Sequence, residues 1–220
     1  LDSIKRVNLA GTAELHSSSF LPALSGNGLI AAFSTRASNV VSGDAGGFED
    51  VFVTTPQTGL TARVSQLPSG AGDGDSYGVS VSHLGDIMAF ASKATNLVGD
   101  DTNGVVDIYV KNQAAQTAVR ASVSSAGVQA NGNSINPSIS SDGAVVVFES
   151  EASNLVLGDA NGFKDIYLRD LTTGQTVLVS RGLGGVDANG NSSEPALSAD
   201  GRYVVFTSLA ANLVAGDTNL

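Results

Sequence analysis

The stretch that decides the fold of this chain is DTNGVVDIYV, residues 101–110. It returns about 58 residues later as DANGFKDIYL, residues 159–168. The same loop pattern occurs four times, with an aspartate at Asp44, Asp101, Asp159 and Asp217 that is followed two residues on by Gly46, Asn103, Asn161 and Asn219. Repeats of roughly this length predict a solenoid, a propeller or another repeat array.

Two further landmarks keep the same period. The segments before the loops read TRASNVVSGD, SKATNLVGDD, SEASNLVLGD and SLAANLVAGD, which puts asparagines in register at Asn39, Asn96, Asn154 and Asn212. A Ser-containing segment ends in register at Ser25, Ser82, Ser140 and Ser198. Because separate landmarks stay in step, the repeat extends over the whole chain.

Each unit contains four short apolar runs. In the third unit, residues 137–150 read PSISSDGAVVVFES, two β-rich runs around a Ser-Asp-Gly turn in which Gly143 can adopt positive φ. Residues 165–180, DIYLRDLTTGQTVLVS, form two alternating runs around a Thr-Gly turn. No segment combines a helical apolar stripe with helix caps. Four strands in a unit of this length indicate a propeller blade, since solenoid coils are shorter and helical arrays have another period.

The sequence therefore predicts an all-β chain, a β-propeller of four-stranded antiparallel blades built from about four repeats of about 58 residues. Residues 1–220 form a single propeller unit, with blades at about 18–66, 76–123 and 134–181. We expect the last blade to be split between the C- and N-termini, as residues 192–220 plus 1–10. The reason is that Arg6-Val7-Asn8 aligns with Arg63-Val64-Ser65 at the end of an outermost strand.

The split blade lacks one strand, of the Asp-Ile-Tyr type, and an open strand edge is normally covered in a folded protein. Three arrangements satisfy this requirement. The chain is part of a longer propeller, or it closes as a four-bladed ring with one thin blade, or a neighbouring molecule completes the blade. The third arrangement is a head-to-tail contact, which produces a ring or a filament according to its rotation.

The hairpin SADGRYVVFTS (residues 198–208) and the later strand type DIYLRDL (165–171) resemble the TolB-like, WD-type propeller repeat. That family has a Ser-Pro-Asp-Gly turn, an apolar strand ending in Phe-x-Ser, and an Asp-Ile-Tyr strand. Here the turn lacks its proline. The resemblance covers nearly the whole chain and implies a propeller fold. For function it implies a wide choice, because the family includes periplasmic envelope proteins, propeller domains of peptidases and many secreted proteins.

Composition excludes several classes of function. The chain has no Cys, so it offers neither a disulfide framework nor a thiolate site. Its net charge of −10 opposes binding to phosphate backbones, so we expect no nucleic-acid partner. No apolar run is long enough to span a bilayer, so we expect no membrane insertion. Many Gly, Ser, Asn and Thr residues without Cys are typical of an exported bacterial protein, extracellular or periplasmic.

The recurring loop is the one constellation with the chemistry of a site. Its oxygen-bearing side chains follow a D-x-N-G-x-x-D spacing, as in the calcium loops of integrin-type propellers, and the candidate ligands are Asp101, Asn103, Asp107, Asp159, Asn161 and Asp165. Calcium prefers six to eight oxygen ligands, more than three side chains supply. The alternative is turn chemistry, because Asp and Asn before Gly form Asx-turns. No other cofactor is expected.

Two Asn-Gly-Asn-Ser loops, residues 131–134 and 189–192, precede the innermost strands and would lie near the propeller axis. They are either a rim that contacts a glycan or peptide, or turns that connect blades. Catalytic signals are few: the histidines are His16 and His83, and the paired carboxylates Asp100-Asp101 and Asp73 with Asp75 lie in repeated turns.

The sequence thus predicts a non-catalytic, exported propeller scaffold that binds a protein or glycan through its loop faces. One alternative is a structural subunit of an extracellular polymer or array, in which self-association completes the split blade. A third is a propeller domain of a larger hydrolase.

Overall fold

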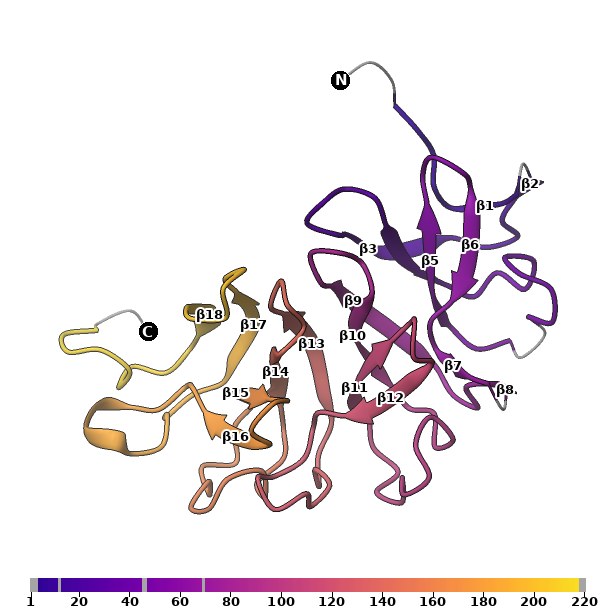
Figure 1. Cartoon of the computed structure of the whole chain (residues 1–220). Helices are drawn as coiled ribbons and strands as arrows, with labels where there is room; N and C mark the ends of the chain where they lie inside the picture. Colours follow the sequence, from indigo (N-terminus) through magenta and orange to yellow (C-terminus); the bar gives the residue numbers. More distant parts are fainter. Residues whose placement is uncertain (1–3, 12, 45–46, 69, 218–220) are drawn as a thin grey trace.

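The computed structural model describes residues 4–11, 13–44, 47–68 and 70–217. Within these ranges the chain is built of β-strands, with one short 3-10 turn, η1 (Leu183–Gly185), and no α-helix. No described helix could therefore cross a membrane. Figure 1 shows the sheets side by side in an open arc, with the N-terminus at one end and the C-terminus at the other.

Three blades are complete antiparallel sheets whose strands follow chain order from one edge to the other. The first comprises β3 (Ser19–Leu24), β4 (Ala31–Thr35), β5 (Asp50–Thr55) and β6 (Leu60–Arg63). The second comprises β9 (Ser76–Val81), β10 (Ile87–Ser92), β11 (Asp107–Asn112) and β12 (Thr117–Arg120). The third comprises β13 (Ser134–Ile139), β14 (Val145–Ser150), β15 (Asp165–Asp170) and β16 (Gln175–Leu178). The expected all-β propeller of four-stranded blades is confirmed.

Short hairpins occupy the linkers between blades. One joins β1 (Leu9–Ala10) to β2 (Ala13–Glu14), and the next joins β7 (Gln66–Leu67) to β8 (Gly70–Ala71). The following linker keeps a single bridge between Val123 and Gln129. These elements precede the innermost strands of the first three blades.

The Ser-Asp-Gly turn works as the sequence predicts. In the third blade, Asp142 accepts hydrogen bonds from the Ser140 hydroxyl at 2.6 Å and from the Ala144 N–H at 3.0 Å. Gly143 then adopts a φ of 73°. These hydrogen bonds hold the pKa of Asp142 below its usual value. An aspartate at this position therefore fixes the hairpin between β13 and β14.

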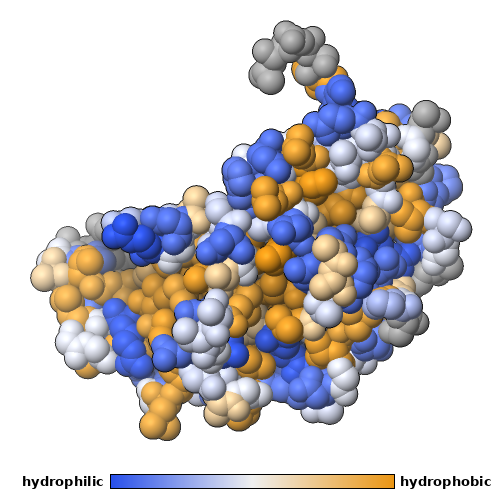
Figure 2. Space-filling model, in the orientation of Figure 1, coloured by the Kyte–Doolittle hydropathy of each residue, from blue (hydrophilic) through white to orange (hydrophobic). Residues whose placement is uncertain are grey.

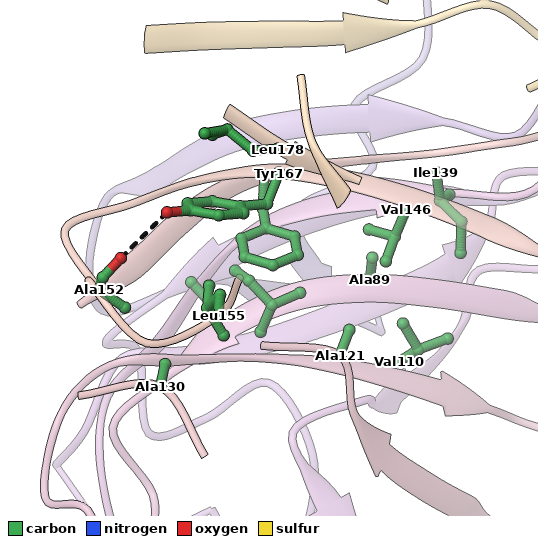
Figure 3. Packing of buried hydrophobic residues seen from close by; sticks show 13 residues of the cluster. Ala89, Val110, Ala121, Ala130, Ile139, Val146, Ala152, Leu155, Tyr167 and Leu178 are labelled. Carbon is green, nitrogen blue, oxygen red and sulfur yellow. Dashed lines mark hydrogen bonds between the residues drawn. The ribbon is translucent and has the colours of Figure 1, made fainter. Parts of the chain in front are cut away.

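The hydrophobic core lies between neighbouring blades. The second strand of each complete blade is almost entirely buried because it packs on both faces. One cluster joins the second and third blades, with Ala89 and Val110 on one side and Val146 and Tyr167 on the other (Figure 3). Each complete blade also pairs two aromatic rings, with centroids about 6 Å apart: Phe33 with Phe52, Phe90 with Tyr109, and Phe148 with Tyr167.

The repeated asparagine fastens each blade to the linker before it. Asn154 accepts the N–H of Asn131 at 3.0 Å and donates to the carbonyl of Gln129 at 2.8 Å. The other three repeats make the same pair of bonds through Asn39, Asn96 and Asn212. The repeated asparagine thus links each blade to the preceding linker through two hydrogen bonds.

The last blade differs from expectation. β17 (Ser192–Leu197) and β18 (Val204–Ser208) form a two-stranded sheet, and no described N-terminal residue pairs with them. The N-terminal segment lies beside the first blade, at the opposite end of the arc (Figure 1). Within the described residues, the segment 192–217 is therefore not joined to residues 4–10 in one sheet. The last loop position, Asn219, lies outside the described residues, as does Gly46 in the first repeat.

Candidate functional site: the Asp-Asn loops and the axial hollow

Asn103 is the centre of the second-blade loop, and its side chain makes three hydrogen bonds. Its amide N–H groups donate to Asp107 Oδ2 at 2.8 Å and to the Ala130 carbonyl at 3.0 Å. Its Oδ1 accepts the N–H of Val105 at 3.3 Å. Gly104 follows with a φ of 71°, which a glycine adopts readily. Asn103 therefore ties the loop to β11 and to the next linker.

Asp107, at the start of β11, is fully buried. Ser122 donates its hydroxyl hydrogen to Oδ1 at 2.5 Å, and the Arg120 guanidinium lies 3.4 Å from Oδ2. Burial raises the pKa of Asp107, while the hydrogen bonds from Ser122 and Asn103 and the charge of Arg120 act in the opposite direction. Desolvation thus outweighs these interactions in favouring the protonated carboxyl.

Asp101 joins the same cluster. Tyr109 donates its hydroxyl hydrogen to Asp101 Oδ2 at 2.5 Å, and Arg120 lies 3.4 Å from Oδ1. The Arg120 guanidinium also lies over the Tyr109 ring, 5.9 Å from its centroid. Burial, with the hydrogen bond to Asp101, raises the pKa of Tyr109 well above its ordinary value. The phenol is therefore a permanent donor in this cluster.

The third-blade loop repeats most of this arrangement. Asn161 donates to Asp165 at 2.7 Å, Ser180 donates to the other oxygen of Asp165 at 2.5 Å, and Tyr167 donates to Asp159. The arginine, however, is absent from the repeat position. In the strand register Arg120 faces Tyr109, and Leu178 faces Tyr167.

The first-blade loop keeps the arginine and loses the tyrosine. Arg63 contacts Asp44 at 2.8 Å and Asp50 at 3.8 Å, and it lies over the ring of Phe52. Ser65 donates to Asp50 at 2.5 Å. A buried arginine thus neutralises the loop aspartates in the first and second blades, but a leucine replaces it in the third.

These contacts show what the loops do for the fold: they connect the third strand of a blade to the fourth and to the following linker. No group of three or more His, Asp or Glu side chains is arranged as a metal site in the described part of the chain. The calcium ligands inferred above (Asp101, Asn103, Asp107, Asp159, Asn161 and Asp165) stay a prediction. The third loop is the best candidate among them, because no arginine occupies the position beside its aspartates.

The Asn-Gly-Asn-Ser loops make connections between blades. Asn133 Oδ1 accepts the N–H of Val106 at 3.0 Å, and Asn191 Oδ1 accepts the N–H of Lys164 at 2.9 Å. At Gly132 and Gly190 an added Cβ would lie within 3 Å of the backbone that follows the second strand of the same blade, at residues 151–152 and 209–210. The geometry explains the composition of these loops by close packing.

The candidate catalytic residues are dispersed. His83 is exposed at the tip of the second-blade hairpin, and His16 is exposed in the first linker. Asp73 accepts two hydrogen bonds from Thr95, at 2.6 and 2.8 Å, and Asp75 forms an ion pair with Arg36 at 2.8 Å. These aspartates hold linkers and loops in place.

A different feature repeats on the innermost strands. Each of these strands carries one residue with positive φ, directly before a proline or valine: Leu21 (48°), Gly78 (65°), Asn136 (53°) and Glu194 (54°). A register shift accompanies it in every blade. A non-glycine residue pays about 1–2 kcal/mol for this conformation, so three of the four blades hold it against a local cost.

Three of the four residues lie together where the innermost strands converge. Leu21, Gly78 and Asn136 line a hollow of about 220 Å³, together with Pro22, Val79, Pro137 and Pro195. Glu194 immediately precedes Pro195. We call this feature the axial hollow. It is formed by four strands from four blades, as expected where the innermost strands of a propeller converge.

Sequence reasoning missed the axial hollow, although a signal was present. The serine two residues earlier is constant, at Ser19, Ser76, Ser134 and Ser192, while the left-handed position holds Leu, Gly, Asn and Glu. The fold therefore fixes the backbone at this position but not the side chain.

Several solved structures share this fold. TolB from Acinetobacter baumannii superposes with a TM-score of 0.52 at 17% identity, over 86% of this chain and 37% of that one. A putative TolB from Agrobacterium tumefaciens gives 0.53 at 19% identity, over 86% and 59%. Dipeptidyl peptidase 4 from Porphyromonas gingivalis gives 0.51 at 15% identity, over 86% and 29%.

No protein-family model matches the sequence, and no curated protein matches it. The chain has a TolB-like β-propeller fold, and it spans less than two thirds of each of the three chains compared.

Proposed function

We propose that this chain is a non-catalytic module of an exported propeller protein and that it binds a peptide segment of a protein partner at the axial hollow. One observation carries the proposal: the backbone at the left-handed position is the same in all four blades, while the side chain there is different in each. Strain retained at the same point of three of the four repeats is typical of functional positions.

The chemistry of the hollow suits an extended peptide. Three prolines, Leu21 and Val79 supply apolar surface, and the amide of Asn136 supplies a donor and an acceptor. A sugar ring would be expected to stack on an aromatic side chain, and no aromatic residue lines the hollow. The chain's charge of −10 favours a partner segment that carries Lys or Arg.

Binding is favoured over hydrolysis by the environment of the candidate catalytic groups. The paired carboxylates serve as acceptors and ion-pair partners within linkers, and the two histidines lie apart on exposed loops. The peptidase among the compared proteins shares the fold, and this chain covers 29% of it. Membership in a larger hydrolase is the alternative.

The test is selection of binding peptides from a random display library, followed by fluorescence anisotropy with the selected peptides. Replacing Asn136 with Ala removes the amide, and replacing Leu21 with Gly removes the apolar side chain while keeping the left-handed backbone. Each is expected to weaken binding at least tenfold, about 1.4 kcal/mol. Thr172→Ala, in an exposed hairpin of the third blade, is the matched control.

Peptides that bind both variants as tightly as the wild type would place the site elsewhere. If the wild type binds glycans on an array and Asn136→Ala does not, the ligand of the axial hollow is a glycan and not a peptide.

A further inference from the structure

Lys111, on the third strand of the second blade, is a buried cation without a counter-charge. Its exposed fraction is 1%, and in the described part of the chain it forms no ion pair. The one hydrogen bond of its ammonium group goes to the backbone carbonyl of Gln66 in β7. Burial lowers the pKa of Lys111. An ammonium group held away from water without a carboxylate is costly, so its presence here requires an explanation.

A surface hollow of about 490 Å³ lies beside this lysine. Lys111 pairs with Ala118 in the register of β11 and β12, so both side chains lie on the same face of the sheet. Ala118 lines the hollow from the sheet, and Leu67, which follows Gln66, lines it from the linker. We call this feature the lysine hollow. The rest of its wall consists of Pro68, Leu97, Val98, Gly99, Gln116 and Thr117. Figure 2 shows hydrophobic surface among polar residues over the part of the arc where β7 and β12 lie in Figure 1.

The wall of the lysine hollow contains a strained residue. Gln116 has a φ of 53°, and the equivalent positions of the other complete blades are Gly59 at 70° and Gly174 at 72°. A glycine adopts this conformation readily, whereas a residue with a side chain does so at a cost. The second blade thus keeps a side chain where the fold favours glycine. Strain of this kind is typical of binding positions.

The third blade offers an internal comparison. Its equivalent hollow, of about 510 Å³, is lined partly by serines and by Thr176. The cation at the position of Lys111 is Arg169. Its Nη1 donates to the carbonyls of Ser124 and Gly174, at 3.2 and 2.6 Å, and to the Thr176 hydroxyl at 3.0 Å. The chain therefore supplies three acceptors to the third-blade cation and one to Lys111.

We propose that the lysine hollow binds a small amphipathic carboxylate, with its charged group on the Lys111 ammonium and its apolar chain along Leu97 and Val98. The ligand is an anion because an opposite charge would compensate the buried ammonium. One ammonium balances one negative charge, which favours a carboxylate over a phosphate group of charge about −1.5 to −2.

The size and flexibility of the site suit such a ligand. The volume of the hollow lies within the range of about 300–1,000 Å³ found for small-molecule sites, and most of its wall is apolar. The flexible stem of Lys111 allows its ammonium to turn from the Gln66 carbonyl toward a carboxylate in the hollow. This site is separate from the axial hollow, so it does not depend on the peptide proposed there.

The probe is octanoate, and isothermal titration calorimetry of the 220-residue chain measures its affinity. Octanol has the same apolar chain without the charge. Octanoate should bind more tightly than octanol by about tenfold or more. Equal affinities of the two compounds would overturn the proposal, because they would show apolar binding without a role for the ammonium.

Lys111→Met removes the charge and keeps an unbranched stem. It should weaken octanoate binding by about tenfold or more and leave octanol binding unchanged. Because it removes an uncompensated buried charge, the variant should be at least as stable as the wild type, which urea unfolding verifies. Lys93→Met, at an exposed lysine directly after β10, is the matched control and should bind octanoate as the wild type does. Octanoate binding unchanged by Lys111→Met would overturn the proposal.

A second variant and a spectrum locate the ligand. Gln116→Gly restores the residue of the other blades and should weaken octanoate binding about threefold, because it removes part of the wall. In the nuclear magnetic resonance spectrum, octanoate should shift the amide signals of residues 66–67, 97–99 and 116–118. The equivalent signals of residues 124–125, 155–157 and 174–176 should stay in place. Shifts confined to other parts of the chain would overturn the proposal.

A peptide that ends in leucine carries the same combination of apolar group and carboxylate. It should bind more weakly than octanoate, because its backbone adds polar groups that the apolar wall does not satisfy. Tighter binding of this peptide, lost when its terminal carboxylate is amidated, would identify a protein terminus as the ligand and overturn the assignment to a small molecule.

Discussion

The carboxylate of Glu149 on β14 accepts the backbone N–H of Glu194 on β17, at 2.9 Å. Its other oxygen accepts a hydrogen bond from the Lys164 ammonium at 2.8 Å. Glu149 is buried, and Glu194 is the left-handed residue of the last blade. The contact therefore anchors a strained point near the axial hollow to the side of the third blade, and joins the fold to the proposed binding site.

Replacing Glu149 with Ala should destabilise the chain by about 2 kcal/mol, the loss expected for hydrogen bonds to a charged group. Lys164 remains partly exposed, so its ammonium can be hydrated and the loss stays below that of a fully buried pair. Urea unfolding measures the change. Glu151→Ala, two residues on and exposed, should shift the free energy of unfolding by at most about 0.5 kcal/mol. Equal effects of the two substitutions would show that the Glu149 contact contributes nothing specific.

Arg120→Leu reproduces in the second blade the residue found at the same register position in the third. It leaves Asp101 and Asp107 buried without their cation, and loss of one member of a buried ion pair costs about 3–5 kcal/mol. We expect the lower end, about 3 kcal/mol, because Arg120 contacts both aspartates at 3.4 Å and its Nε makes no hydrogen bond. Thermal and urea unfolding report the loss. Arg181→Leu is the exposed control, and a similar loss there would contradict the assignment.

The buried aspartates should make the folded chain more stable at acidic pH than at neutral pH, the opposite of the effect of an aspartate held in its charged form. Burial raises the pKa of Asp165, against hydrogen bonds from Ser180 and Asn161 that lower it. Since the folded chain then binds the proton more tightly than the unfolded chain, this group's contribution to stability falls as pH rises from the unfolded value, near 3.8, through the raised folded value.

Asp165→Asn has no such proton to lose. The free energy of unfolding of the wild type, minus that of Asp165→Asn, should decrease as pH rises from 4 to about 7. Urea unfolding at several pH values provides the comparison. A difference that increases with pH would show that the aspartate is stabilised in its charged form, by its hydrogen bonds or by a bound cation.

Calcium binding can be tested loop by loop. A divalent cation at Asp101 would meet the charge of Arg120, whereas in the third loop Leu178 holds the register position of that arginine. Calcium in the millimolar range should therefore raise the melting temperature through the third loop, because a ligand of the native state stabilises it. Asp159→Asn should abolish the rise and Asp101→Asn should preserve it. If neither calcium nor a chelator changes the melting temperature, the loops bind no calcium and serve only as turns.

Much of this architecture could be predicted from the sequence because repetition makes local signals redundant. The Ser-Asp-Gly hairpin is fixed by contacts of Asp142 within four residues of chain, so its composition alone predicts it. The second strands were visible as apolar runs because blades cover both of their faces. The repeat of Asn154 could be recognised in the sequence. Its structural role could not, because its hydrogen-bond partners lie more than twenty positions away.

The parts that escaped prediction depend on curvature and on differences between repeats. The rotation angle between neighbouring blades decides whether the ends of the arc meet. No sequence motif predicts that angle. The axial hollow escaped because Leu21 and Glu194 look like ordinary strand residues, and their positive φ arises from the register shift against the second strand. A search for positions that vary within a constant frame would have found them.

Strain at the axis gives the last prediction. Leu21 holds a φ of 48° with its side chain largely exposed, so Leu21→Gly relieves a cost of about 1–2 kcal/mol and incurs about 1 kcal/mol of backbone entropy. The variant should be about 0.5 kcal/mol more stable than the wild type, yet weaker in peptide binding. Gly78→Leu is the reverse change at the equivalent position. An added Cβ there has room, with Pro137 3.9 Å away, so the expected loss of about 1–2 kcal/mol comes from the backbone. If urea unfolding showed both variants to be destabilised equally, the left-handed position would be maintained by packing of its side chain, and the argument that stability is given up there for recognition would fail.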